Sequence, residues 1–192
     1  MSKYRTRIIN ELTSALTPLG PIGATLDFGS GDGFFADQLP RQVSLGSVTP
    51  VDVVERTHSL VKPIIYAGDR LPFTDGQFEL AYAIDVLHHC PDPMSALVDL
   101  TRCTSRYLLI KDHNQNGPIG QFVLSVLDEI GNRRFGIPSP YLYQHNWAWV
   151  DWLEQSQGFK RIHFVHPMPC HTGLLGLTNR LQFVGLWERP GA

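Results

Sequence analysis

Short apolar runs alternate along most of the chain with stretches in which apolar residues recur at helical spacing. The apolar runs predict strands at residues 24–28, 47–54, 62–69, 78–85, 106–112, 159–166 and 180–189. Helical spacing predicts helices near the N-terminus and at residues 34–40, 93–103, 118–130 and 145–157. Strands that alternate with helices indicate a parallel sheet with helices on both faces.

The C-terminal part of the pattern departs from this alternation. No helix is evident between the runs 159–166 and 180–189, so we expect these strands to form an antiparallel pair at one edge of the sheet. The pattern therefore predicts an α/β fold with a doubly wound, mostly parallel, seven-stranded sheet and a helical insertion after the fifth strand. The 192 residues suit a single domain that spans residues 1–192.

Composition narrows the class of protein. Hydrophobic residues make up 43% of the sequence, which is typical of a globular fold, and the net charge of −2 disfavours a nucleic-acid-binding surface. The N-terminus resembles an amphipathic helix rather than a signal peptide, and no apolar run is long enough for a membrane span. The three cysteines form no CxxC pair, which argues against a structural zinc site or a redox dithiol, and their odd, sparse count suits a reducing compartment. We expect a cytoplasmic protein that binds neither nucleic acid nor membrane.

The most informative stretch is LDFGSGDGFF at residues 26–35, in which three glycines follow the first predicted strand at alternate positions. Glycine allows a sharp turn or the close approach of another group to the backbone. In a doubly wound sheet, ligands bind beyond the carboxyl ends of the strands, which is where this loop lies. We expect Gly29 and Gly31 to turn the backbone and present N–H groups, and Gly33 to let the next helix start close to the strand.

Asp52 ends the second predicted strand, about 20 residues after the glycine loop, where a carboxylate can accept hydrogen bonds from the hydroxyls of a ribose. A dinucleotide site favours the spacing G-x-G-x-x-G, but Phe34 occupies the last of these positions and the spacing here is G-x-G-x-G. Asp27 would repel a pyrophosphate, whereas it could orient the ammonium of an amino acid. These features favour S-adenosylmethionine, which carries no phosphate, over NAD.

Four stretches, LDFGSGDG, VDVV, AGDRLPFTDGQFEL and IDVLHHCPDPMSAL, resemble in the same order the successive motifs of class I S-adenosylmethionine-dependent methyltransferases. The resemblance covers roughly residues 20–112 and implies a Rossmann-like fold, S-adenosyl-L-methionine as cofactor and S-adenosyl-L-homocysteine as product. The later residues resemble, more weakly, a group of small bacterial methyltransferases. The stretch between Asp52 and Asp69 is short, which implies that one helix of the fold is reduced.

The resemblance implies nine cofactor-binding positions along the glycine loop, the second strand, the segment after the third strand and the end of the fourth. They are Asp27, Gly29, Ser30, Gly31, Asp52, Val53, Asp69, Asp85 and Val86. The first four would line the methionine side of the cofactor. The carboxylate of Asp52 would bind the ribose, with Val53 against the adenine and Asp69 near the adenine amino group. The last two would border the cofactor where the fourth strand ends.

Methyl transfer needs a base only if the acceptor must lose a proton, and histidine is the favoured type near neutral pH. His113 follows the fifth predicted strand and His89 follows the fourth, so both are candidate catalytic bases or acceptor-binding groups, although His113 could also bond backbone at the strand end. We expect the adjacent side chains of His88 and His89 to diverge, so that at most one faces the acceptor. The histidine spacings suggest no ligand pair, and we expect no catalytic metal.

Residues 113–146 leave the carboxyl end of the fifth strand and form the predicted lid or substrate-selecting insertion. The short chain and the lack of a basic patch in the sequence favour a small-molecule methyl acceptor, with oxygen, nitrogen or carbon as the acceptor atom. Two alternatives remain open. One is a catalytically silent nucleoside-binding or scaffold protein with the same fold, and the other is an NAD-dependent oxidoreductase, which Phe34 and Asp27 disfavour.

Overall fold

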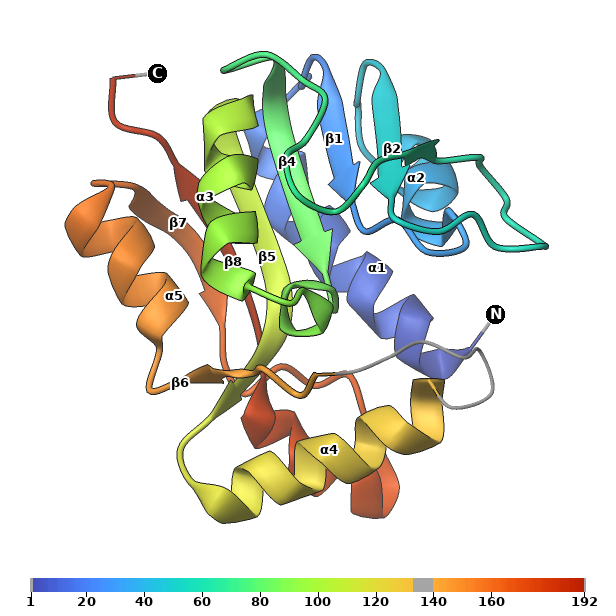
Figure 1. Cartoon of the computed structure of the whole chain (residues 1–192), viewed down its shortest axis with the longest axis vertical. Helices are drawn as coiled ribbons and strands as arrows, with labels where there is room; N and C mark the ends of the chain where they lie inside the picture. Colours follow the sequence, from blue (N-terminus) through green and yellow to red (C-terminus); the bar gives the residue numbers. More distant parts are fainter. Residues whose placement is uncertain (1, 133–139, 192) are drawn as a thin grey trace.

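The computed structural model of the chain describes residues 2–132 and 140–191. In this part of the chain the strands form one mixed sheet in the order β3-β2-β1-β4-β5-β8-β7, and β6 pairs with β5 outside that path (Figure 1). The strands are β1 (Thr25–Phe28), β2 (Val48–Asp52), β3 (Ile64–Ile65), β4 (Phe78–Ile84), β5 (Thr104–Gln115), β6 (Gln144–His145), β7 (Lys160–Val165) and β8 (Gln182–Glu188).

Strand directions follow the predicted pattern. Strands β1 to β5 pair in parallel, whereas β8 runs antiparallel to both β5 and β7. The prediction of a doubly wound, mostly parallel sheet with an antiparallel C-terminal pair is confirmed, and the two-residue strand β6 is an addition to the seven strands expected. Strand order reverses between β1 and β4, and ligands bind at such a switch point in sheets of this type.

Helices cover both faces of the sheet (Figure 1). They are α1 (Lys3–Leu16), α2 (Phe34–Gln38), α3 (Pro93–Cys103), α4 (Pro118–Asn132) and α5 (Ala148–Asp151), the last continuing as a π-helical turn at Trp152–Ser156. Because side chains alternate along a strand, β4 contributes to two apolar clusters. Ala83 packs with Leu100 of α3 and Trp149 of α5, whereas Tyr82 packs on the other face with Leu12 of α1.

The start of α3 is fixed by local chemistry. Asp92 is the N-cap residue, and its side chain accepts the N–H of Ser95 at 3.0 Å, while Pro93 occupies the first helical turn. Both residues suit a helix start. The backbone N–H groups of the first turn have no partner within the helix, and the Asp92 side chain accepts one of them, whereas proline has no N–H that needs a partner. The 3₁₀ turn Leu87–His89 precedes this cap and lies in the connection from β4 to α3.

Strand β5 is longer than the sequence pattern predicted. The pattern ended this strand at residue 112, but β5 continues to Gln115 because Asn114 pairs with Gln144 of β6 and His113 pairs with Gln182 of β8. Asp112 and His113 therefore lie within a strand, and the predicted insertion 113–146 begins inside the sheet. Residues 133–139 of that predicted insertion lie outside the described residues.

Two connections also bear on the predictions. The segment between β2 and β3 contains no helix, as the short spacing of the motifs implied. The segment between β7 and β8, for which we expected no helix, contains a 3₁₀ stretch at Gly173–Leu181. Across residues 2–132 and 140–191, the helices lack the length and apolar character that a bilayer crossing requires.

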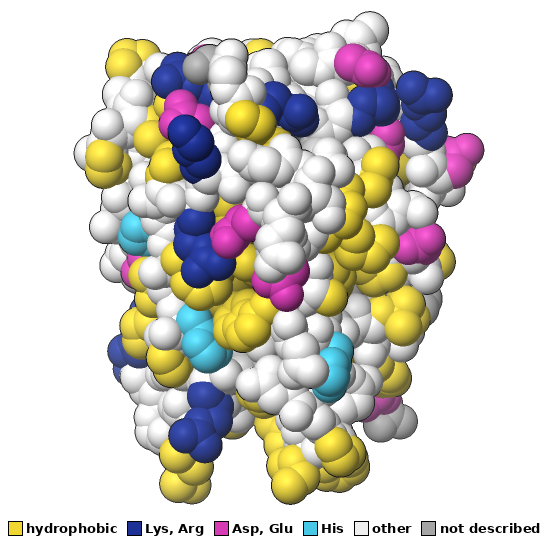
Figure 2. All heavy atoms as spheres, turned by 90° about the vertical axis from the view of Figure 1, so that its left-hand side faces the viewer, with side chains coloured by type: hydrophobic (Ala, Val, Ile, Leu, Met, Phe, Trp, Pro, Cys, Tyr) yellow, Lys and Arg dark blue, Asp and Glu magenta, His cyan; other side chains and the backbone are white. Residues whose placement is uncertain are grey.

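Exposed apolar side chains gather at one end of the molecule. Helix α4 and the 3₁₀ stretch Gly173–Leu181 form the lower end in Figure 1, and Figure 2 shows hydrophobic side chains projecting there. The most exposed apolar side chains of these two elements are Ile119, Phe122, Leu174 and Leu177. These elements flank the carboxyl ends of the central strands, where the candidate site lies.

Candidate functional site

The glycine loop, residues 29–33, lies at the carboxyl end of β1. The N–H groups of Gly29 and Ser30 both donate to the carbonyl oxygen of Val51, at 2.9 and 3.1 Å, and tie the loop to β2. Gly29 has a φ of +68°, and a Cβ at this position would lie 2.1 Å from Cγ2 of Val86. Glycine is therefore required at position 29 for its conformation and for the close approach of the chain that follows β4.

Asp52 holds the same loop from the side of β2. Its Oδ2 accepts the N–H of Gly31 at 2.8 Å, and its Oδ1 accepts the N–H of Val53 at 2.7 Å. The half-exposed side chain of Val53 lies 3.3 Å from the place where a Cβ on Gly68 would stand. The predicted ribose-binding carboxylate and the predicted adenine contact are thus neighbours, between the end of β2 and the segment that follows β3.

Asp27 and Ser30 bring buried polar atoms to the loop. Asp27 is 2% exposed, and within residues 2–132 and 140–191 its Oδ2 and the Oγ of Ser30 make no hydrogen bond. Burial raises the pKa of Asp27 to about 8, against the opposing effect of the Tyr82 hydroxyl, and the charge of Asp52 adds to the rise. A buried carboxylate needs a charged or hydrogen-bonding partner. These two atoms therefore fit the ammonium of an amino acid, as the expected cofactor carries.

The segment between β2 and β3 folds back over the glycine loop. A Cβ on Gly33 would lie 2.6 Å from the backbone nitrogen of Val61, so Gly33 makes room for this segment, a role in addition to the predicted one at the start of α2. The guanidinium of Arg56 lies 3.2 Å from the place where a Cβ on Gly31 would stand. The contribution of this segment to the wall of the site was not predicted from the sequence.

Asp85 connects the end of β4 to helix α1. Its carboxylate accepts a hydrogen bond from the buried ammonium of Lys111 at 2.5 Å and one from the hydroxyl of Tyr4 at 2.7 Å. Burial alone would raise the pKa of Asp85, but the charge and hydrogen bond of Lys111, together with the charge of His113, outweigh it and lower the pKa below its ordinary value. These contacts of Asp85 hold α1 against the sheet. The exposed side chain of Asp69 accepts a hydrogen bond from the backbone N–H of Arg70 at 2.7 Å. Their contacts with the cofactor stay predictions.

A second group of polar side chains lies at the carboxyl ends of β4 and β5. We call it the histidine cluster, and its members are His88, His89, Asp112, His113, Asp128 and Tyr143. The fully buried Asp112 contacts Nδ1 of His88 at 2.5 Å and accepts the backbone N–H of His113 at 2.7 Å. On the other side of the His88 ring, Nε2 lies 3.3 Å from Oδ2 of Asp128.

The charges in the histidine cluster move its pKa values in opposite directions. Burial would lower the pKa of His88, but Asp112 and Asp128 outweigh it and raise this pKa to about 10. Burial and the positive charge of His88 lower the pKa of His89 to about 4. Burial also lowers the pKa of His113, against the hydrogen bond to Asp112. At neutral pH, His88 is therefore an imidazolium, whereas His89 and His113 are neutral imidazoles that can accept a proton.

The expectation that His88 and His89 diverge was wrong. Their ring centroids are 4.1 Å apart, and the ring of His113 packs edge-on to His88 at 4.7 Å. Neighbouring side chains point to opposite faces only in an extended strand, whereas these two residues lie in the 3₁₀ turn Leu87–His89, in which successive side chains are about a third of a turn apart. The structure therefore brings both predicted catalytic histidines, His89 and His113, into one cluster.

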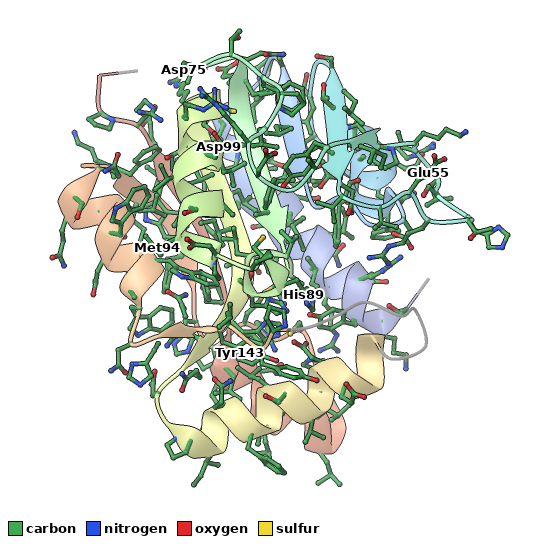
Figure 3. The ribbon with its side chains drawn as sticks, viewed as in Figure 1. Glu55, Asp75, His89, Met94, Asp99 and Tyr143 are labelled. Atoms are coloured by element: carbon green, nitrogen blue, oxygen red, sulfur yellow. The ribbon has the colours of Figure 1, made fainter. Side chains whose placement is uncertain are left out.

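Two members of this cluster come from the predicted insertion, where no individual role was predicted for them. Asp128 lies on α4, and the Tyr143 hydroxyl donates to its Oδ2 at 2.6 Å. Figure 3 shows His89 and Tyr143 near the level where β5 meets β6, above α4. The available signal was the pair of carboxylates Asp128 and Glu129 on a largely apolar helix in the predicted insertion, but nothing local to them indicates a contact with the end of β4.

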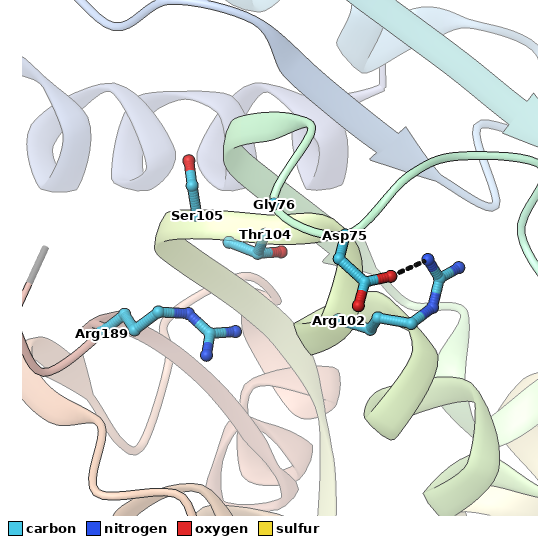
Figure 4. A pocket seen from close by; sticks show the side chains of 6 residues that line it. All are labelled: Asp75, Gly76, Arg102, Thr104, Ser105 and Arg189. Atoms are coloured by element: carbon cyan, nitrogen blue, oxygen red, sulfur yellow. Dashed lines mark hydrogen bonds and ion pairs between the residues drawn. The ribbon is translucent and has the colours of Figure 1, made fainter.

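A separate depression of about 420 Å³ lies at the opposite end of the sheet, where β5 begins (Figure 4). Its side chains already have partners in the protein. Arg102 pairs with Asp75 at 2.8 Å and with Asp99 at 2.7 Å, and the hydroxyl of Ser105 donates to the carbonyl oxygen of Phe78 at 3.0 Å. These contacts connect α3, β4 and β5, so we assign this depression a structural role.

The strand order, the glycine loop after β1 and the acidic residue that ends β2 define a class of protein, the Rossmann-like nucleoside-binding enzymes. Residues 26–106 match the family model described as a methyltransferase domain. The match covers both the glycine loop and the carboxyl end of β4. The chain therefore contains a methyltransferase domain, and the findings support S-adenosylmethionine as its cofactor.

Solved structures share this fold at low sequence identity. An S-adenosylmethionine-dependent methyltransferase from Mesorhizobium loti has a TM-score of 0.65 and 15% identity, over 94% of this chain and 96% of that chain. The 1,6-didemethyltoxoflavin-N1-methyltransferase of Burkholderia thailandensis, with 1,6-didemethyltoxoflavin and S-adenosylhomocysteine bound, has a TM-score of 0.63 and 15% identity, over 94% and 77%. The cyclase SpnF has a TM-score of 0.64 and 13% identity, over 97% and 81%. Among curated proteins, none matches the sequence.

The residues around the glycine loop fit the cofactor of this class. Asp27 and Ser30 would hold its ammonium, Asp52 its ribose and Val53 its adenine. When bound, the cofactor supplies a methyl group on a positively charged sulfur, which an acceptor removes by in-line displacement. The protein's own part is to hold the acceptor close and collinear, and effective molarities of about 10⁵–10⁸ M are reached by such positioning.

Proposed function

We propose that this methyltransferase transfers the methyl group to a small molecule that binds between the carboxyl ends of β4 and β5 and helix α4. The burial of the candidate acceptor-binding groups is the observation that carries the proposal. His88 is 1% exposed and His113 is 6% exposed, and Tyr143 covers both rings at centroid distances of 5.2 and 5.7 Å. A compact acceptor can enter such a site, whereas the surface of a folded macromolecule cannot.

In this proposal His113 accepts a proton from the acceptor. Its Nδ1 lies 3.2 Å from Oδ1 of Asp112, and the tautomer with the proton on Nδ1 donates to that carboxylate. Nε2 is then the basic nitrogen, and the lowered pKa keeps it unprotonated at neutral pH. Asp112 itself acts as the orienting group, because its fully buried carboxylate already accepts the backbone N–H groups of His113 and Leu87.

The proposal also assigns acceptor selection to the described parts of the predicted insertion. Helix α4 supplies Asp128, and the stretch that leads into β6 supplies Tyr143. Both lie outside residues 26–106, the part of the chain that matches the family model. Side chains that distinguish one methyltransferase from another are expected outside the shared cofactor-binding core, on the loops and insertions that the core positions.

The test supplies the enzyme with S-adenosylmethionine that carries a radiolabelled methyl group, together with small-molecule, protein or nucleic-acid fractions of a cell extract. We expect label to enter the small-molecule fraction. Label in the protein or nucleic-acid fraction would overturn the proposed acceptor class. Binding of S-adenosylhomocysteine without labelling of any fraction would instead support a silent nucleoside-binding protein, because the fold alone does not determine the reaction.

A variant tests the role of His113. We expect His113→Gln to lower kcat about 100-fold or more, as is usual for the loss of a general base, with little change in the affinity for S-adenosylhomocysteine. The matched control is His166→Gln, which replaces an exposed histidine after β7, outside the glycine loop and the histidine cluster. An equal loss of turnover and cofactor affinity in His113→Gln would mean that His113 has a structural role.

A further inference from the structure

The geometry points to a binding site for a divalent transition-metal ion such as Zn²⁺, which we propose is held by Nε2 of His88, a ring nitrogen of His89 and a carboxylate oxygen of Asp128. Ligand atoms from these three residues lie within 4.8 Å of one another. Two imidazoles and one carboxylate form a donor set that suits Zn²⁺ and related first-row ions. The proposal departs from the sequence-based expectation of no metal and does not depend on the proposed acceptor.

The orientation of His88 is the first observation that favours this site. The side chain is 1% exposed, and its Nε2 makes no hydrogen bond within the described ranges 2–132 and 140–191. The nearest carboxylate oxygen is Oδ2 of Asp128, at 3.3 Å. Two ligand atoms about 2.1 Å from a tetrahedral ion stand about 3.4 Å apart. The spacing of these two atoms therefore already matches that of ligands to one ion.

The surroundings of these ligands resemble the outer shell of a metal site. Metal-binding histidines usually donate their other ring N–H to a carboxylate, which fixes the tautomer and the ring orientation. Asp112 has this position, because its Oδ1 lies 2.5 Å from Nδ1 of His88. The Tyr143 hydroxyl donates to Oδ2 of Asp128 at 2.6 Å and orients that carboxylate in the same way. On binding, the ion displaces the Nε2 proton of the His88 imidazolium to solvent, and the negative charges of Asp112 and Asp128 favour the divalent ion in its place.

A second set of potential ligands, His88, Asp112 and His113, shares the cluster, but its geometry is less suitable. The distance of 2.5 Å between Nδ1 of His88 and Oδ1 of Asp112 is that of a hydrogen bond and is too short for two ligands of one ion. Asp112 also accepts two backbone N–H groups, which fix it to the sheet. We therefore place the ion on the α4 side of His88, where the partly exposed His89 leaves a route from solvent.

The experiment uses the full chain after chelator treatment and measures Zn²⁺ by equilibrium dialysis and elemental analysis, and Co²⁺ by its visible absorption. We expect one ion per chain and ligand-field bands typical of nitrogen and oxygen ligands. His89→Gln and Asp128→Asn should each weaken binding about 100-fold or more, because each removes a direct ligand, and the exposed His58→Gln should bind as the wild type does.

Three results would overturn the proposal: no stoichiometric binding to the wild type, equal binding by wild type and both ligand variants, or an equal loss in His58→Gln. If the thermal melting curve shows that Asp128→Asn does not fold, the test depends on His89→Gln alone. His89 is partly exposed, so we expect its replacement to leave the fold intact. Binding of S-adenosylhomocysteine is measured on the same samples. A protein that binds S-adenosylhomocysteine but no metal would contradict the metal site alone, without contradicting the proposed function.

Discussion

Replacement of Asp27 by asparagine tests whether the site is prepared to receive a cation. Burial is the largest cause that raises the pKa of this carboxyl from its ordinary 3.8 to about 8. The unfolded chain loses the proton near pH 4, whereas the folded chain keeps it until about pH 8. The folded state therefore binds more protons throughout that window, and its stability decreases as pH rises.

The size of the effect follows from the two pKa values. Each pH unit inside the window lowers the free energy of unfolding by about 1.4 kcal/mol, which amounts to roughly 5 kcal/mol between pH 4 and pH 8. Asparagine has nearly the same shape and does not titrate, so Asp27→Asn should escape this loss. The difference in unfolding free energy between the variant and the wild type should therefore change in favour of the variant as pH rises from 5 to 8.

The assay is urea unfolding of both proteins, without cofactor, at several pH values from 5 to 9. Other titrating groups cancel in the difference between the two proteins, and Asp151→Asn, at an exposed carboxylate on α5, is the matched control. A difference between Asp27→Asn and wild type that stays constant from pH 5 to pH 8 would refute the reasoning. It would show that Asp27 is ionised in the free protein.

The same carboxyl links cofactor affinity to pH. The ammonium of S-adenosylhomocysteine binds the ionised form of Asp27, so binding releases a proton wherever the free protein holds one. Between pH 5 and pH 7 we expect the affinity of the wild type to rise up to about tenfold per pH unit. Titration calorimetry measures this slope and the proton released. Asp27→Asn should bind more weakly at pH 7 and lose the slope.

Three further predictions concern the walls of the site. Asp52→Ala should weaken S-adenosylhomocysteine binding at least about tenfold in a thermal-shift titration, because hydrogen bonds to a charged acceptor contribute about 1.5–3 kcal/mol each. Binding as tight as that of the exposed control Asp151→Asn would rule out the ribose assignment. Tyr4→Phe removes the hydroxyl between α1 and Asp85 and should lower the free energy of unfolding by about 2 kcal/mol in urea; an unchanged midpoint would contradict this role. Gly29→Ala should lower the melting temperature by several degrees, since its Cβ would meet Val86 and its φ is positive; a wild-type melting curve would show that the loop can relax.

The histidine cluster shows where inference from sequence stopped. Adjacent positions suggested that His88 and His89 diverge, and the end of an apolar run suggested that His113 follows a strand. The first expectation failed because a 3₁₀ turn replaces the extended chain, and the second because β6 and β8 extend β5 through pairing. Both corrections depend on contacts with residues that lie far away in the sequence.

The sequence alone determined the sheet and the cofactor loop. Apolar periodicity, three glycines and Asp52 act through local backbone geometry and strand order, so their pattern could be interpreted without coordinates. Only the tertiary structure decided that Asp128 of α4 lies 3.3 Å from His88, and that Asp27 is buried enough for its pKa to reach about 8. Burial and charge pairing depend on which distant segments pack together, and that packing leaves no periodic signal in the chain.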